Sequence, residues 1–308
     1  MQSTSNILLI RPTGFRFNPE TAGSNAFQQT IDADELTLRN RVLAEFDSFA
    51  ETLRSKGVDV NIIEDTPSPE KPDAIFPNNW VSFHPDGRVI LYPLYAENRR
   101  HERRLNIIES LQKKFIIRDV IDFSGHEKQN RFLESTGSMI FDHVNKITYA
   151  CLSPRTDKEL FIQVCKVLKY TPVHFLAHDE LGKEIYHTNV MMCIGEGFAV
   201  ICLGSITDLS ERNRAVESLK NSGHLIVDIT HSQMNHFAGN MLALRSRDGS
   251  PLLAMSQSAF DSLTTAQLQT LGKFAQLVPL SIPTIETLGG GSARCMIAEI
   301  FLTLKPAA

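Results

Sequence analysis

A cysteine near the end of the sequence stands where a nucleophile is useful. Cys295 follows the glycine-rich run 289–294 (GGGSAR) and begins an apolar segment that predicts a strand over 296–302. Glycines allow close backbone approach to a ligand, and a thiol at the mouth of a strand, carried by such a loop, suits covalent catalysis. The alternative is an inert, buried cysteine after an ordinary turn.

Other segments also place polar residues directly before a predicted strand. They contribute Asp73, Asn78 and Asn79, then Glu134 and Ser138, then His187 and Asn189, and finally Asn240. Cysteine, histidine and glutamate together supply a nucleophile, a proton shuttle and a charge partner. Each of these residue types alone is more often structural, so a catalytic role requires that the fold bring them together.

A repeated order of elements predicts that it does. The pattern strand, turn, strand, helix, strand recurs about every fifty residues, with first strands at 80–83, 139–141, 190–194, 241–244 and 296–302. The predicted helices are 34–54, 97–113, 157–168, 209–221 and 264–274, and the first unit places its last strand at 115–120. The fifth unit is split, with its first strand near the C-terminus and the rest, beginning at 7–10, near the N-terminus.

Five such units predict a closed, pseudo-symmetric five-bladed α/β propeller of strand-strand-helix-strand units, with residues 1–308 forming one domain. In a radial array the residues that precede the five first strands converge on the axis. These residues are Asn79, Ser138, Asn189, Asn240 and Cys295. We therefore expect the chemistry on the axis, with 25–27 and 77–80 as candidate lid segments.

Composition limits the class of partner. The 308 residues include 42% hydrophobic and 21% charged residues, and the formal net charge of −4 argues against nucleic acid or an anionic membrane as the main partner. Five cysteines, an odd number without metal-ligand spacing, are typical of reduced thiols. We expect a cytoplasmic protein with no metal and no cofactor, whose partner is a small-molecule substrate; a homodimer is a possible assembly.

The sequence resembles the guanidino-group-modifying, or pentein, superfamily of deiminases, dihydrolases and amidinotransferases. The resemblance covers nearly the whole chain and is carried by the motifs 289–295 (GGGSARC), 132–138 (FLESTGS) and 186–189 (YHTN). It implies the pentein propeller, with Cys295 as nucleophile and His187 as general acid/base. It also implies that Glu134 orients the imidazole and binds a substrate nitrogen. Arg155, in the segment LSPRT, inherits the binding of a substrate carboxylate.

Two asparagines depart from the deiminase pattern, which has aspartate at the positions of Asn79 and Asn189. Carboxylates suit a cationic guanidinium, whereas a neutral amide also donates to the oxygen of a neutral ureido group. The sequence looks closest to citrulline utilisation hydrolases, and hydrolysis of citrulline to ornithine, ammonia and carbon dioxide is the first prediction. Succinylarginine dihydrolases, which carry asparagines near these positions, still accept a guanidine.

The predicted mechanism begins with a Cys295 thiolate favoured by a protonated His187, which later protonates the leaving nitrogen and activates water. Asn78, Asn79 or Asn240 would donate to a developing oxyanion, and Asp73 lies among the substrate-binding candidates. The alternatives are an arginine or methylarginine deiminase or dihydrolase, and an amidinotransferase. A non-enzymatic propeller of the kind seen in initiation factor six is a further alternative.

Overall fold

Every β-sheet in the structure has three strands joined in the same way. The computed structural model describes residues 1–306. In each sheet the first strand is antiparallel to the central strand, and the central strand is parallel to the third. The five sheets are β15 (Ala298–Glu299), β1 (Asn6–Arg11) and β2 (Asp59–Glu64); β3 (Val81–Phe83), β4 (Arg88–Leu91) and β5 (Asp119–Asp122); β6 (Ile140–Asp142), β7 (Ile147–Leu152) and β8 (Thr171–Leu176); β9 (Met192–Gly195), β10 (Phe198–Ile201) and β11 (Leu225–Asp228); β12 (Leu242–Arg245), β13 (Pro251–Ser256) and β14 (Gln276–Leu280).

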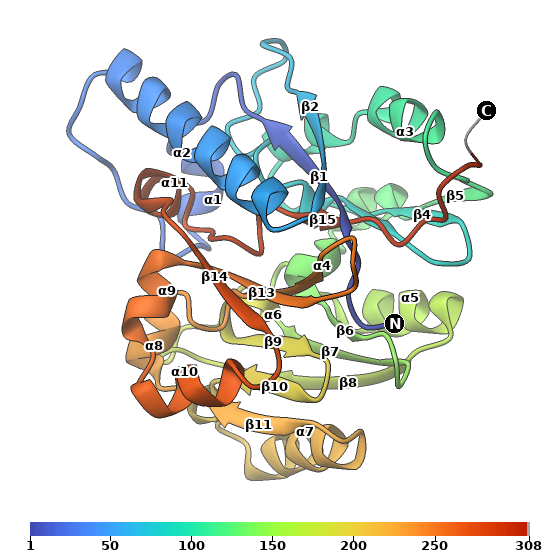
Figure 1. Ribbon diagram of the computed structural model, residues 1–308, viewed down its shortest axis with the longest axis vertical. Helices are drawn as coiled ribbons and strands as arrows, with labels where there is room; N and C mark the ends of the chain where they lie inside the picture. The colour runs from blue at the N-terminus through green and yellow to red at the C-terminus, as the bar shows by residue number, and fades with distance from the viewer. Residues whose placement is uncertain (307–308) are drawn as a thin grey trace.

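Helices connect the central and third strands and cover the outside of the sheets (Figure 1). The longer ones are α2 (Glu35–Ser55), α3 (Leu105–Gln112), α5 (Lys158–Leu168), α7 (Leu209–Asn221) and α10 (Thr265–Leu271). The shorter α-helices are α1 (Pro19–Ala22), α4 (Ser135–Ser138), α6 (Thr188–Met191), α8 (His231–Asn235), α9 (Gln257–Ser262) and α11 (Pro283–Gly289), and the 3-10 turns are η1 (Pro77–Asn79), η2 (Asn98–Glu102), η3 (Ser124–Gln129) and η4 (Leu203–Ser205). Side-chain caps start four of the longer helices, at Asp34, Asp157, Asp208 and Thr264.

The five-bladed architecture is confirmed. First strands of neighbouring blades lie side by side: β6 contacts β9, β9 contacts β12, and β15 contacts β3. The split blade joins the two ends of the chain, because Ile7 and Leu8 of β1 pair with Glu299 and Ala298 of β15. The buried apolar residues form four clusters that span neighbouring blades rather than filling one blade each. The first strands therefore surround the axis, as the repeat predicted.

Several predicted boundaries are wrong, and burial explains them. The strand expected over 115–120 is β5, Asp119–Asp122; Phe115 is instead a fully buried residue of the core. The helix expected over 97–113 divides into η2 and α3 at Arg103 and Arg104. The strand expected over 296–302 is shortened to β15, after which Ile300 bridges to Phe83 of the next blade. Apolar side chains that pack between neighbouring blades produce the same apolar pattern in the sequence as a strand does, and this pattern gave the wrong boundaries.

The residues expected in loops before the first strands lie in or beside single helical turns. Asn79 ends η1, Ser138 ends α4, and Asn189 lies in α6. These turns were not predicted, since a run of four residues carries no periodicity. The prediction of a single domain over 1–308 stays a prediction. Within residues 1–306, no helix combines the length and apolarity that a bilayer span requires.

Candidate active site

Short helical turns bring the predicted chemical groups to the axis. Glu134 is the residue before α4, and His187 is the residue before α6. Cys295 follows α11 and a glycine turn in which Gly290 adopts a positive φ of 59°. A Cβ on Gly290 would lie 2.6 Å from Asn25 Nδ2, so the loop backbone must pass close to the N-terminal segment.

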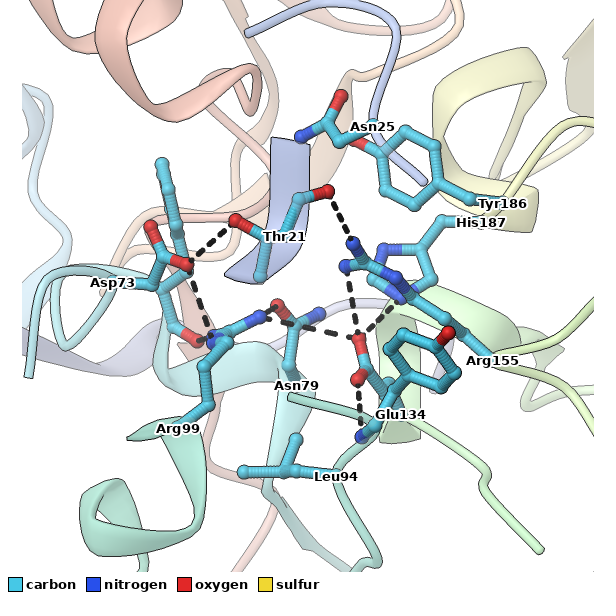
Figure 2. Close-up of polar contacts among 12 residues, drawn as sticks. Thr21, Asn25, Asp73, Asn79, Leu94, Arg99, Glu134, Arg155, Tyr186 and His187 are labelled. Carbon is cyan, nitrogen blue, oxygen red and sulfur yellow. Dashed lines mark hydrogen bonds and ion pairs between the residues drawn. The ribbon is translucent and has the colours of Figure 1, made fainter. Parts of the chain in front are cut away.

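Glu134 is the centre of the polar network (Figure 2). Its side chain is fully buried, and its Oε2 lies 2.7 Å from His187 Nε2, 3.5 Å from Arg155 Nη1 and 3.9 Å from Arg99 Nη1. Its Oε1 accepts a hydrogen bond from Tyr95 N at 2.9 Å. Burial alone would favour the neutral acid, but Arg155, His187 and Arg99 hold the pKa of Glu134 well below its usual range. Glu134 is therefore a carboxylate.

This carboxylate fixes the tautomer of His187. A carboxylate only accepts hydrogen bonds, so the nitrogen that faces it, Nε2, carries the proton, and Nδ1 is left with its lone pair. Burial lowers the pKa of His187 to about 4, although Glu134 opposes that shift. In the free protein His187 is neutral and ready to accept a proton at Nδ1.

Cys295 rests as a thiol. Its side chain is buried, and that burial raises the pKa of the thiol above its ordinary value, in spite of hydrogen bonds that favour the anion. Asn189 Nδ2 lies 3.4 Å and Asn240 Nδ2 lies 3.3 Å from the sulfur. The predicted resting thiolate beside a protonated His187 is therefore wrong: desolvation favours the uncharged form of both groups.

The structure gathers most of the other predicted site residues around one cavity. Asp73, Asn79, Arg155, His187 and Cys295 all line it. Arg155 is buried, with its guanidinium 4.9 Å from the ring centroid of Tyr186. Asp73 accepts a hydrogen bond from Asn18 Nδ2 at 2.7 Å through Oδ2, while its buried Oδ1 has no partner within residues 1–306.

The remaining predicted residues lie behind that cavity wall. Asn189 and Asn240 do not line the cavity, but each donates to the sulfur of Cys295, which does. Asn78 is fully buried, its backbone carbonyl accepts a hydrogen bond from Thr136 Oγ1, and its side chain does not line the cavity. The assignment of Asn78 as a substrate-binding residue is therefore not favoured by its position.

Arg99 was missed, and of the N-terminal segment, residues 18–28, only 25–27 was singled out, as a candidate lid. Arg99 makes two ion-pair contacts with Glu102, at 2.8 and 2.9 Å, and donates to Asn79 Oδ1 at 2.8 Å. In the sequence it is one of several basic residues in a charged run, typical of a solvated helix, so nothing marked it. Thr21, from the N-terminal segment, also lines the cavity. Thr21 lies in a segment without a clear helical or strand period, so no pattern in the sequence marked it.

The N-terminal segment closes the site. Asn25 Nδ2 lies 3.2 Å from the carbonyl oxygens of both Gly289 and Gly290, and Arg155 Nη2 lies 3.2 Å from the Thr21 carbonyl. The cavity that remains has a volume of about 20 Å³, room for about one water molecule. The other proposed lid, 77–80, is wrong: it is a buried turn in which Trp80 is 1% exposed. The lid role of 25–27 stays a prediction.

Beyond the N-terminal segment the surface is hollowed by a larger cleft of about 680 Å³. Phe27 and Tyr186 line it, and Tyr186 also lines the inner cavity. Residues of the N-terminal segment line both hollows, so this segment lies between the outer cleft and the inner cavity. Within residues 1–306, no cluster of three or more histidine, cysteine or acidic side chains has a geometry that could hold a metal ion.

Gly137 lies where Asn79 and His187 approach each other. A Cβ at this position would lie 2.4 Å from Asn79 Nδ2 and 2.8 Å from His187 Cε1. We expect Gly137→Ala to displace the imidazole and to lower kcat/KM by about 100-fold, the usual cost of an ångström-scale misplacement. Steady-state kinetics will check this. Gly125→Ala, whose Cβ meets nothing within 4 Å, is the control and should leave the rate unchanged; equal rates for both variants would contradict the prediction.

Comparison with known proteins gives one family and one fold. The model of the family described as N,N dimethylarginine dimethylhydrolase, eukaryotic, matches residues 11–302. No curated protein sequence matches the chain. Among solved structures the chain is similar to ArgZ, an arginine dihydrolase from the ornithine-ammonia cycle in cyanobacteria, at 17% identity and a TM-score of 0.73, covering 98% of this chain and 41% of that one.

The chain thus spans about two fifths of the full-length ArgZ, but it covers 99% of the N-terminal domain of ArgZ in a structure of a cysteine-to-serine variant bound to substrate, at 17% identity and a TM-score of 0.71. It is also similar to a histidine-to-glycine variant of dimethylarginine dimethylaminohydrolase, an adduct with S-methyl-L-thiocitrulline. There the identity is 14% and the TM-score 0.65, with 97% of this chain and 100% of that one covered. The resemblance to the guanidino-group-modifying superfamily is confirmed.

Proposed function

The chain belongs to the N,N-dimethylarginine dimethylhydrolase family, whose model spans residues 11–302, and from this premise we propose that it is a cysteine hydrolase of a guanidino amino acid. Arginine is the first substrate to test, with ornithine as the final product. This revises the first prediction, in which citrulline was the starting substrate. The family match and the similarity to an arginine dihydrolase support the alternative more strongly.

The observation that carries the proposal is the neutral Cys295–His187 pair. Moving the thiol proton to an imidazole whose pKa is about 4 is uphill, on the order of 7 kcal/mol from an ordinary thiol. A guanidinium about 4 Å from the sulfur would recover about 4 kcal/mol at the effective dielectric of a protein. A neutral ureido group offers no such attraction. The site therefore favours a cationic first substrate that helps to ionise its own nucleophile.

The other end of the cavity suits an α-amino acid. Arg155 offers a planar guanidinium to a carboxylate. Asp73, with its unpartnered Oδ1, offers an acceptor to an ammonium group, although burial raises the pKa of its carboxyl above the ordinary value. A bound ammonium would favour the ionised form of Asp73. These groups lie on the cavity wall together with Cys295, so an amino acid admitted by movement of the N-terminal segment would contact all three.

Asn79 supports continued hydrolysis beyond citrulline. Arg99 has only donors, so the Asn79 atom 2.8 Å from it must be the amide oxygen. The amide nitrogen then faces away from Arg99, beside His187 across Gly137, and has no partner within residues 1–306. A free N–H suits the oxygen of a ureido group or of the tetrahedral intermediate formed from it. An aspartate at this position would offer no donor.

The proposed first half-reaction releases one ammonia. The thiol proton passes to His187 Nδ1 as the sulfur attacks the guanidino carbon, and the imidazolium then protonates the leaving nitrogen. Water, deprotonated by the again neutral His187, adds to the S-linked amidino carbon. The C–S bond breaks, citrulline forms, and the thiol is restored. Glu134 remains ionised throughout and stabilises the imidazolium.

In the second half-reaction the same groups act on citrulline, which stays in the site. The sulfur attacks the ureido carbon, a second ammonia departs, and water hydrolyses the carbamoyl thioester. The carbamate that results decomposes to ornithine and carbon dioxide. The overall balance is one arginine and two waters to one ornithine, one carbon dioxide and two ammonia.

The experiment that tests the proposal offers arginine, asymmetric dimethylarginine, agmatine and citrulline separately, with ammonia, methylamines, citrulline and ornithine all measured. We expect two ammonia and one ornithine per arginine, and weak turnover of agmatine, which lacks the carboxylate for Arg155. Dimethylamine released from dimethylarginine without action on arginine would assign the methylated substrate. Turnover of citrulline alone would favour the second candidate, a citrulline hydrolase, for which the Asn79 donor is the supporting observation.

Replacing the amide donor of Asn79 should change the main product. We expect Asn79→Asp to end at citrulline instead of ornithine, because the carboxylate repels the developing oxyanion of the ureido step while it still accepts from Arg99. The ratio of ornithine to citrulline formed from arginine should fall at least tenfold. Asn106→Asp, an exposed change of the same kind on α3, should keep the wild-type ratio. Ornithine as the main product of Asn79→Asp would remove Asn79 from the second half-reaction.

A further inference from the structure

The sulfur of Cys295 lies between two amide groups that occupy equivalent positions in neighbouring blades. Asn189 precedes β9, Asn240 precedes β12, and these strands lie side by side. Both side chains are almost completely buried, at 0% and 1% exposure. Their Nδ2 atoms lie 3.4 and 3.3 Å from Sγ, within hydrogen-bonding distance for sulfur. Repetition of the blade has therefore placed two donors on one thiol.

The orientation of the Asn240 amide is dictated by its neighbours. The backbone N–H of Arg294 donates to Asn240 Oδ1 at 3.0 Å, which fixes the oxygen on that side, and the resting thiol can also donate to this oxygen at 3.7 Å. The nitrogen then faces the sulfur, and it also donates to the Asn189 carbonyl at 2.9 Å. A rotated amide would bring two donors together at Arg294 and two acceptors together at Asn189. Asn240 is thus held as a donor toward Sγ.

The cation next to Cys295 in the sequence makes no hydrogen bond to the sulfur. The guanidinium of Arg294, the residue next to Cys295, turns away to Glu299 Oε2 and the Ile297 carbonyl, both at 2.9 Å. His187 is neutral, as shown above. The side-chain nitrogens within hydrogen-bonding distance of Sγ in residues 1–306 belong to the two asparagines alone. Stabilisation of a sulfur anion by hydrogen-bonding side chains must therefore come from these two N–H dipoles, to which the Ser292 backbone and the charge of Arg294 add.

We propose that Asn240 and Asn189 are catalytic residues that hold the Cys295 thiolate, rather than substrate-binding residues. The sulfur carries negative charge when it attacks and again when it leaves the hydrolysed intermediate, and two fixed amide donors stabilise it at both points. Asn189 has a second task, because its buried Oδ1 has no partner within residues 1–306 and can accept an N–H of the amidino group. The Asn240 oxygen accepts from Arg294 N–H and lies 3.7 Å from Sγ, so both ends of this amide face the chain at Cys295 rather than the substrate. The inference rests on Cys295 being the nucleophile, as in the proposed function.

Alkylation of the thiol in the absence of substrate tests the assignment. The probe is iodoacetamide, and the rate of modification of the Cys295 peptide is followed by mass spectrometry from pH 6 to 11. Asn240→Asp keeps the acceptor for Arg294 N–H but replaces the donor that faces Sγ with a carboxylate oxygen. We expect the Cys295 profile to move to higher pH, with alkylation at least tenfold slower at a fixed pH below the midpoint. The control Asn106→Asp should follow the wild-type profile.

Kinetics separate the two asparagines. We expect Asn240→Asp to lower kcat with little change in KM, whereas Asn189→Asp, which adds an acceptor for a cationic substrate, should lower kcat and KM together. An unchanged alkylation profile in Asn240→Asp would overturn the proposal. If Asn240→Asp does not fold, judged by circular dichroism, the Asn189→Asp profile decides in the same way. Because alkylation requires no turnover, its outcome is independent of which amino acid the protein hydrolyses.

Discussion

Cys295→Ser is expected to lose turnover by about 10⁴-fold or more, the scale on which removal of a nucleophile acts in enzymes with covalent intermediates. The hydroxyl of serine is a far weaker acid than the thiol, and the neutral His187, with a pKa of about 4, is too weak a base to ionise it. The measurement is single-turnover release of ammonia from arginine, together with intact-protein mass spectrometry for the covalent adduct. Wild type should show the adduct and Cys295→Ser should not.

The matched control is Cys193→Ser. Cys193 is buried on β9 and does not line the cavity around Cys295, and burial raises the pKa of its thiol to about 12. The change from sulfur to oxygen is the same, so a loss of stability common to both variants is separated from a loss of chemistry. Ammonia release by Cys295→Ser at a rate near that of Cys193→Ser would remove Cys295 from the mechanism, and with it the proposed function.

Glu134→Gln has the second largest expected effect. The substitution keeps the shape of the side chain but removes the charge that stabilises the His187 imidazolium, and the amide can present a nitrogen to His187 Nε2, which would exchange the tautomer. An isosteric change of this kind beside a catalytic histidine costs about 10⁴-fold in kcat in serine proteases, and we expect a loss of similar size. Arg155 and Arg99 also lose a buried counter-charge, so the protein should become less stable.

Glu127→Gln separates these two effects. Glu127 accepts from the backbone of Leu94 and pairs with Arg103 at 2.6 Å, just as Glu134 accepts from the adjacent Tyr95 and lies beside arginines. It has no contact with His187. Thermal unfolding should report a loss of stability in both variants, whereas the large fall in kcat should be confined to Glu134→Gln. A fall of equal size in Glu127→Gln would mean that the carboxylate at position 134 acts through stability alone.

The sequence predicts the architecture well because its signal is repeated. Each of the five units alone is ambiguous, but the recurring order of elements and the common place of the polar residues both indicate five equivalent blades. The helices predicted over 209–221 and 157–168 lie within one residue of their predicted bounds. Where a single segment had to be interpreted alone, apolar content misled: Phe115 reads as strand but is a buried residue after α3. Side chains that pack between blades follow no local period.

The residues that gather in the candidate site were predictable, but their charges were not. Cys295, His187 and Glu134 stand out by type and position, yet whether a thiol beside an imidazole is ionised depends on how completely both are buried, and burial is a property of the closed fold. Arg99 shows a second limit. It lies in a charged run that is typical of a solvated helix, and only the division of that run into η2 and α3 turns it inward.

Closure of the ring by the split blade also has a consequence for the order of assembly. β1 lies near the beginning of the chain and cannot pair with β15 until residues 298–299 have been synthesised, and contacts between such distant residues form late because closing a long loop is entropically costly. Cys295 lies only a few residues before β15. Cys295 therefore cannot meet Asn189 and Asn240 before this part of the chain has been synthesised. A nascent chain that has not yet reached these residues carries an open ring, and the proposed site is not assembled in it.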